Sequence, residues 1–134
     1  MKSEELQILL SKTRNAVIAI NRPGRSPHAT PVWFLWDGES FFITTVTTSV
    51  KYALLKQNPD VTLVIDDDVE MHQYAIAYGR AEIIDQNVQQ LADQLRDKYV
   101  PPELREEWTK ILFSPHRIII KLHPDKLLTG PDLG

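Results

Sequence analysis

The sequence contains no cysteine, and this absence removes several classes of chemistry. Without cysteine there can be no disulfide, no thiolate ligand for a metal and no thiol nucleophile. A chain of 134 residues buries a core adequate for stability without such cross-links. The lack of cysteine also fits a reducing compartment.

A basic excess is lacking as well. Lysine and arginine together number 15 against 18 aspartates and glutamates, which gives a net charge of -3 and a pI near 5.8. Nucleic acids and anionic membranes need a basic face, so neither is expected as a partner. A local basic site remains compatible with this composition.

Long hydrophobic runs are also missing. No apolar stretch approaches the length needed to cross a bilayer. The N-terminal segment MKSEELQILLSK has acids inside its short apolar stretch, unlike a signal peptide. We therefore expect a cytoplasmic protein, and the length predicts one domain over residues 1–134.

Apolar periodicity predicts a mostly β protein with flanking helices. Strands are expected at 16–20, 28–36, 40–45, 60–65, 73–85 and 117–122. Helices are expected at 3–12, 50–57, 87–99 and 102–112, and an irregular tail after His123-Pro124. Neighbouring strands joined by tight turns favour an antiparallel sheet, and strands that must protect their edges tend to close into a barrel.

Hydroxyl side chains gather between the third predicted strand and the second helix. They are Thr44, Thr45, Thr47, Thr48 and Ser49. One of them, Thr48 or Ser49, suffices to cap the helix. Lys51 follows in the first turn, where the helix dipole disfavours a cation. Hydroxyls, free helix amides and an ammonium group in one place predict a phosphate site, with a solvated threonine-rich loop as the alternative.

A phosphate site needs the rest of a ligand. Aromatic residues lie on the preceding strand and on the fifth, namely Trp33, Phe34, Trp36, Tyr74 and Tyr78. A flat heteroaromatic ring could lie along these strands. Strand residues alternate between faces, so Trp33 and Phe34 cannot both point inward. For each aromatic residue, core packing or a subunit interface is the alternative.

Three segments together resemble a known family. They are HATPVWFLWDGESFFITTVTTSVKYALLKQNPDVTLVI, the glycine-containing strand AIAYGRAEII, and the closing strand FSPHRIIIKLHPDK. Their order and spacing resemble the pyridoxamine 5′-phosphate oxidase-like, FMN-binding split β-barrel family over about residues 5–128. The resemblance implies a six-stranded antiparallel split β-barrel of the FMN-binding type. It also implies a homodimeric oxidoreductase with flavin sites at the subunit interface.

The resemblance also implies roles for individual residues. The strand Thr30, Pro31, Val32, Trp33 and Phe34 would run along the flavin ring. Thr44 and Thr45 would contact the ribityl chain and phosphate, and Ser49 and Lys51 would hold the phosphate. No catalytic acid or base is implied, because hydride transfer belongs to the cofactor.

Two departures from the vitamin B6 oxidases leave the activity open. Val50 stands where those enzymes have an arginine, and the chain lacks their C-terminal substrate-binding segment. The short form looks more like the subfamily that uses the deazaflavin coenzyme F-420. A deazaflavin-dependent reductase, a non-catalytic flavin or tetrapyrrole carrier or sensor, and a small barrel acting only as an interaction module are therefore the alternatives.

Two further sites in the sequence carry charged residues that could bind a ligand. Residues 66–68 with Glu70 and His72 could bind a divalent ion, but consecutive acids after a strand are usually a solvated turn, so no metal is expected. Arg117 opens the last strand. It could reach the cofactor of the partner subunit, and pairing with a surface acid is the favoured interpretation.

Overall fold

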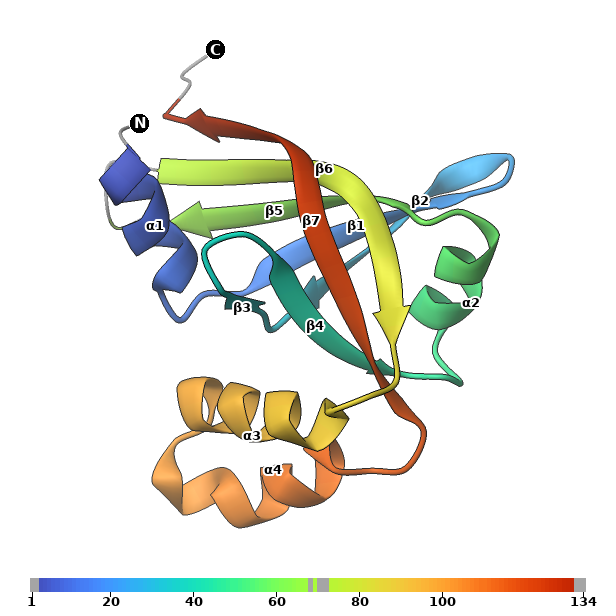
Figure 1. The fold of residues 1–134 in the computed structure, drawn as a ribbon, viewed down its shortest axis with the longest axis vertical. Coiled ribbons are helices and arrows are strands. Elements are labelled where there is room, and N and C mark those ends of the chain that lie inside the picture. The colour runs from blue at the N-terminus through green and yellow to red at the C-terminus, as the bar shows by residue number, and fades with distance from the viewer. Residues whose placement is uncertain (1–2, 68, 70–72, 132–134) are drawn as a thin grey trace.

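Seven strands, rather than the six predicted, form one antiparallel sheet in the computed structural model, which describes residues 3–67, 69 and 73–131. The strands are β1 (Ala16–Arg22), β2 (Arg25–Val32), β3 (Leu35–Trp36), β4 (Phe41–Val46), β5 (Asp60–Asp67), β6 (Gln73–Ile84) and β7 (Arg117–Gly130). Their order across the sheet is β2-β1-β5-β6-β7-β4-β3, and the sheet is strongly curved (Figure 1).

The additional strand arises because the predicted strand 28–36 is divided. β2 pairs with β1, whereas β3 pairs with β4. β2 and β3 therefore form the two edges of the sheet although only Trp33 and Phe34 separate them. Such a link spans at most about 11 Å, so the sheet must curl until its edges nearly meet. The result is a barrel that is split between β2 and β3.

Helix α3 (Val88–Tyr99) supplies hydrogen bonds at this split. The Phe34 amide donates to the Tyr99 hydroxyl at 3.2 Å, and the Phe34 carbonyl accepts from Lys98 Nζ at 3.2 Å. The Tyr99 hydroxyl in turn donates to the Arg14 carbonyl at 2.7 Å. Side chains thus replace the strand-to-strand bonds that are missing at the split.

The last strand is longer than predicted. β7 pairs with β4 along its first half and with β6 along almost its whole length, so the expected irregular tail after residue 123 is wrong. The β6–β7 register shifts between Tyr78 and Gly79, and Gly79 lies opposite Pro124. A Cβ atom on Gly79 would come within 2.8 Å of the His123 carbonyl oxygen. Glycine and proline together therefore permit the irregularity that lets this strand continue.

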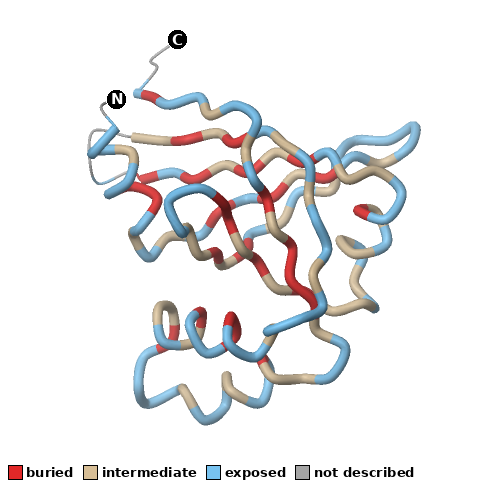
Figure 2. The backbone as a smooth tube through the Cα atoms, viewed as in Figure 1, coloured by how far each residue is buried: buried red, intermediate tan, exposed pale blue. Residues whose placement is uncertain are grey.

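The barrel interior follows from strand alternation. On β4, Phe41, Ile43 and Thr45 are buried while the residues between them are only partly buried. Figure 2 shows the same alternation of buried and more exposed residues along the strands. Every strand except the short β3 contributes buried side chains to the interior cluster. β3 contributes only Trp36, which is partly buried and packs against the cluster.

The predicted helices are all present. They are α1 (Ser3–Ser11), α2 (Val50–Gln57), α3, and the 3₁₀ turn η1 (Pro102–Leu104) leading into α4 (Arg105–Leu112). α1 buries Leu9 and Leu10 in the barrel core. α3 packs Leu91 and Leu95 against Ile119 on the outer face of the barrel. None of the helices in the described part of the chain is long and apolar enough to span a membrane.

The acidic segment after the fourth predicted strand is not entirely a solvated turn. Asp67 is the last residue of β5 and is fully buried. Its carboxylate accepts from Lys12 Nζ at 2.6 Å and from Arg14 Nη2 at 2.9 Å. The hydrogen bond from Lys12 holds the pKa of Asp67 below its ordinary value against the effect of burial. The carboxylate thereby fastens the α1–β1 connection to the end of β5.

Candidate functional site

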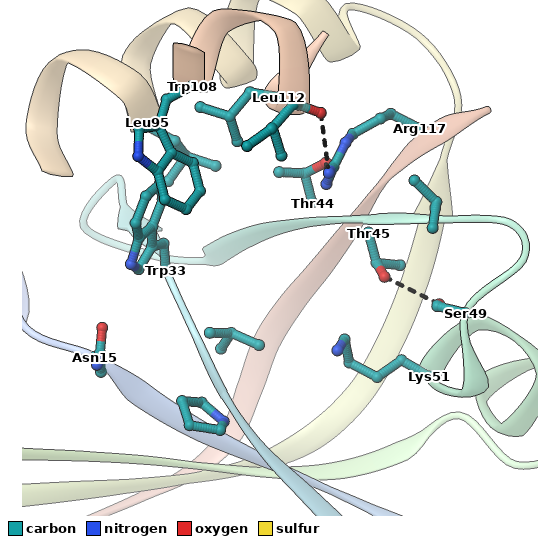
Figure 3. A pocket seen from close by; sticks show the side chains of 14 residues that line it. Asn15, Trp33, Thr44, Thr45, Ser49, Lys51, Leu95, Trp108, Leu112 and Arg117 are labelled. Carbon is teal, nitrogen blue, oxygen red and sulfur yellow. Dashed lines mark hydrogen bonds between the residues drawn. The ribbon is translucent and has the colours of Figure 1, made fainter. Parts of the chain in front are cut away.

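A cavity of about 510 Å³ lies where the barrel, the start of α2 and the helices α3 and α4 meet (Figure 3). Seven of the eight residues proposed from the sequence line it: Pro31, Val32, Trp33, Thr44, Thr45, Ser49 and Lys51. The eighth, Thr30, accepts a hydrogen bond from Lys51 Nζ at 3.4 Å. The structure therefore brings all eight together, and their role in binding a cofactor stays a prediction.

The start of α2 forms one corner of the cavity. Ser49, one of the two predicted candidates, is the N-cap, and its hydroxyl accepts from the Tyr52 amide at 3.1 Å. The Thr45 hydroxyl donates to Ser49 Oγ at 3.0 Å, which orients the cap. The amides of Val50 and Lys51 find no hydrogen-bond partner among the described residues. These donors and the helix dipole favour an anion at this corner.

Two cations share this corner. Lys51 and Arg117 both line the cavity, and neither forms an ion pair with any acid in residues 3–67, 69 and 73–131. Burial, and then repulsion by the nearby Arg117, lower the pKa of Lys51 below its ordinary value. Burial also lowers the pKa of Arg117. The corner therefore carries positive charge that the described part of the protein does not neutralise.

Arg117 corrects one expectation from the sequence. The predicted ion pair with a surface acid is wrong, because Arg117 pairs with no acid among the described residues. Its guanidinium donates instead to the Ser114 hydroxyl at 3.3 Å, the Ile111 carbonyl at 3.2 Å and the Thr44 hydroxyl at 3.5 Å. Figure 3 shows Arg117 beside Thr44, on the same side of the cavity as Lys51 and Ser49. All the bonds it makes here are to neutral acceptors, so its charge remains available to a ligand.

Aromatic and aliphatic side chains form the opposite wall. Trp33 stacks on Tyr99 with ring centroids 4.9 Å apart and planes 7° apart. It also contacts Trp108 at 4.9 Å with a tilt of 42°. As alternation predicts, Phe34 is buried in the barrel whereas Trp33 faces the cavity (Figure 3). The cavity thus has a cationic, hydroxyl-rich end and an aromatic end.

Two other aromatic residues that the sequence suggested as contacts for a ring lie outside this cavity. Tyr78 lines a separate hollow on the sheet, and Trp36 lines a groove between β3 and α3. Sequence reasoning missed the contribution of α4, whose Trp108, Ile111 and Leu112 line the cavity. Their i, i+3, i+4 spacing places them on one face of a helix, but spacing alone does not reveal what that face covers.

The metal alternative gains no support. No cluster of potential metal ligands occurs within the described ranges. Residues 68, 70 and 72 of that hypothesis lie outside the described residues.

The curled antiparallel sheet, split between strands that follow each other in the chain, defines a split β-barrel protein. The sequence model of the family described as pyridoxamine 5′-phosphate oxidase matches residues 3–127. The chain belongs to this family, as its motifs predicted.

Solved structures share the fold over nearly the whole chain. A conserved hypothetical protein of Mycobacterium tuberculosis is 18% identical with a TM-score of 0.80, covering 100% of this chain and 91% of its own. An F420 reductase is 25% identical with a TM-score of 0.73, covering 91% and 94%. A FAD-binding protein of Mesorhizobium loti is 13% identical with a TM-score of 0.71, covering 96% and 92%. No curated protein matches the chain.

Proposed function

We propose that the protein is a homodimeric flavoprotein that binds FMN in this cavity and acts as an oxidoreductase. The observation that carries the proposal is the pair of cations, Lys51 and Arg117, which have no carboxylate partner among the described residues and share one cavity with an aromatic wall. A phosphorylated planar ring has both complementary parts: a dianion for the cationic corner and an aromatic surface for the wall.

Each lining residue then has a definite task. Ser49, Lys51 and Arg117 hold the phosphate, together with the free amides at the start of α2. Thr44 and Thr45 contact the ribityl chain and phosphate, and Thr30 to Trp33 lie along the ring. A bound flavin supplies the hydride or electron transfer. The described lining contains no carboxylate and no imidazole, so these residues bind and orient rather than move protons.

An apolar row on the outer face of the sheet supports the dimer. Successive cross-strand partners place Pro31, Val17, Val64, Ile76 and Leu128 side by side on five neighbouring strands. Val17 is 39% exposed and Leu128 is 41% exposed. Pro31 belongs both to this row and to the cavity lining. A second copy docked on the row would therefore bury apolar surface and lie next to the proposed flavin site.

A deazaflavin-dependent reductase is the second candidate. It is favoured by the F420 reductase among the similar structures, which is 25% identical to this chain. The same cationic corner would accept the phosphate of either cofactor, so the two are distinguished by affinity and not by fold. A non-catalytic carrier or sensor and a cytoplasmic location stay predictions.

Titration of the purified protein tests the proposal. Flavin fluorescence and thermal unfolding are followed with FMN, riboflavin and coenzyme F-420 in turn. We expect FMN to bind more tightly than riboflavin and to raise the unfolding midpoint. Turnover with a reduced nicotinamide then separates an oxidoreductase from a carrier. Tighter binding of coenzyme F-420 would select the second candidate, and binding of none of the three would refute both.

A further inference from the structure

Helix α4 forms an outer wall of the cavity and packs mainly on α3. Trp108, Ile111 and Leu112 lie on its cavity side. Ile111 is 49% exposed, so this wall is only partly supported by the rest of the chain. The position of the wall therefore depends on how firmly α4 is attached to α3.

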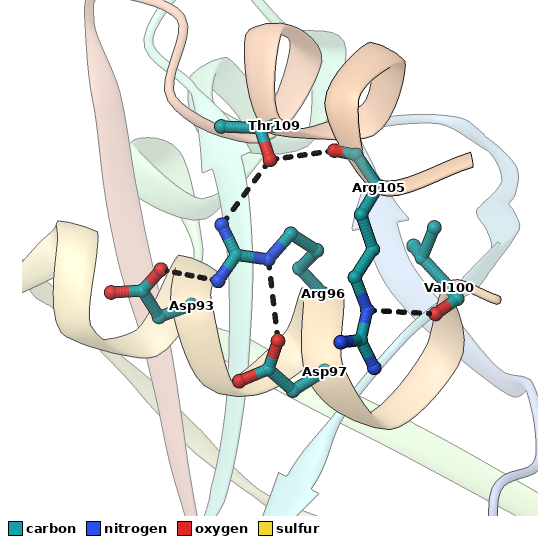
Figure 4. A network of polar contacts seen from close by, with 6 residues as sticks. All are labelled: Asp93, Arg96, Asp97, Val100, Arg105 and Thr109. Carbon is teal, nitrogen blue, oxygen red and sulfur yellow. Dashed lines mark hydrogen bonds and ion pairs between the residues drawn. The ribbon is translucent and has the colours of Figure 1, made fainter. Parts of the chain in front are cut away.

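Arg96 of α3 is the centre of that attachment (Figure 4). Its Nη2 contacts Asp93 Oδ1 at 2.8 Å, and its Nε contacts Asp97 Oδ1 at 3.3 Å, both on its own helix. Its remaining terminal nitrogen, Nη1, donates to Thr109 Oγ1 on α4 at 3.2 Å. The guanidinium also lies over the Phe113 ring, with 5.7 Å between Cζ and the ring centroid. One planar group thus connects α3 to the middle and to the end of α4.

The contacts around Arg96 hold its guanidinium in one orientation. The Arg96 side chain is only 20% exposed, and the two aspartates fix the plane of its guanidinium. The Thr109 hydroxyl, which accepts from Arg96, donates to the Arg105 carbonyl at 2.6 Å. Thr109 directly follows Trp108, whose ring contacts Trp33 in the cavity. A shift at Thr109 would therefore move the aromatic wall.

We propose that Arg96 is a positioning residue: through Thr109 it holds α4 against α3, and so sets the aromatic wall that receives the ring of the ligand. The ligand part of this inference rests on the flavin function proposed above. Arg96 does not line the cavity, so it acts through Trp108 rather than by contact. Ligand affinity then has two determinants, the cationic corner for the phosphate and the positioned aromatic wall for the ring.

Two substitutions test this role. Thr109→Val keeps the side-chain shape but removes the oxygen that bonds Arg96, and Arg96→Lys keeps the charge but loses the planar fork. We expect each to weaken FMN and riboflavin by the same factor, about fivefold. Hydrogen exchange at the amides of residues 105–112 should become faster in both variants. Thr129→Val, an exposed change near the end of β7 and away from α3 and α4 (Figure 1), is the matched control.

The outcomes are distinguishable. Unchanged flavin affinity in both variants, or loss of FMN affinity with riboflavin affinity retained, would overturn the positioning role. A purely structural role would lower the unfolding midpoint without changing either dissociation constant, and this result also counts against the proposal. If the wild-type protein binds no flavin, the flavin proposal fails by itself. Unchanged exchange of α4 in Arg96→Lys would then still refute the attachment.

Discussion

Lys51 gives the sharpest test at the scale of a single residue. Replacing it with alanine removes one of two cations from the cationic corner of the cavity but leaves the aromatic wall intact. A hydrogen bond to a charged group contributes about 1.5–3 kcal/mol, so Lys51→Ala should weaken FMN by roughly ten- to a hundredfold and leave riboflavin nearly unchanged. Fluorescence titration measures both constants. Lys56→Ala on the same helix is the control. Equal losses of affinity for FMN and riboflavin would show that Lys51 does not contact the phosphate.

The pH dependence of FMN binding follows from the same residue. Burial and the neighbouring Arg117 lower the pKa of Lys51, so its proton is lost at a lower pH than that of an ordinary lysine. Only the protonated amine attracts phosphate, so affinity is full below this lowered pKa and falls as pH rises through it. On the acid side, affinity falls below about pH 6, where a phosphate monoester loses its second charge.

Titrations of FMN and riboflavin across pH check this expectation. Riboflavin carries no phosphate, so its affinity should stay flat over the same range. The alkaline fall should disappear in Lys51→Ala. An FMN affinity that rises in alkaline solution would contradict the assigned charge of the corner.

At the scale of elements, local patterns predicted where strands and helices occur but not how strands pair. In the run 28–36, Pro31 indicates a bulge, a bend or a sheet edge, but nothing in the run shows that the chain changes its pairing partner after Val32. The continuation of β7 was missed because Pro124 and polar neighbours indicate irregular chain. The register shift opposite Gly79 accommodates that proline, and it depends on a strand distant in sequence.

The candidate site likewise contains residues that the local sequence predicts and residues that it does not. The hydroxyls and Lys51 were predictable because they lie within eight positions of one another, at a helix start with known capping chemistry. Arg117 was not, because it reaches Thr44 only through the pairing of β7 with β4. Trp108 likewise meets Trp33 only after α4 has packed on α3.

The split between β2 and β3 yields a prediction about elements. Tyr99→Phe removes the hydroxyl that accepts from the Phe34 amide and donates to the Arg14 carbonyl. Leaving such groups without a partner costs about 1–3 kcal/mol, so the free energy of unfolding should fall by that amount. Urea unfolding measures it. Tyr52→Phe is the matched control, because no hydrogen bond of the Tyr52 hydroxyl occurs among the described residues. Equal stability of the two variants would refute the role of Tyr99.

At the scale of the whole molecule, the proposed dimer depends on the apolar row that crosses the sheet. Val17→Lys places a charge in this row, between Pro31 and Val64, and should convert the dimer to a monomer in sedimentation velocity. FMN affinity should fall with it, because the row adjoins the cavity at Pro31. Ile8→Lys, on α1 and 61% exposed, is the control and should remain dimeric.

Two outcomes would count against the dimer. A wild-type protein that sediments as a monomer would refute it directly. A Val17→Lys variant that stays dimeric would show that the dimer interface does not include this row.

The place of β7 between β6 and β4 has a consequence for biosynthesis. A nascent chain on the ribosome carries both neighbouring strands long before residues 117–130 leave the exit tunnel. Until then, two strand edges are open to pairing with other chains. Closure of the barrel therefore cannot precede the synthesis of residues 117–130, and premature termination before residue 117 would release an aggregation-prone fragment.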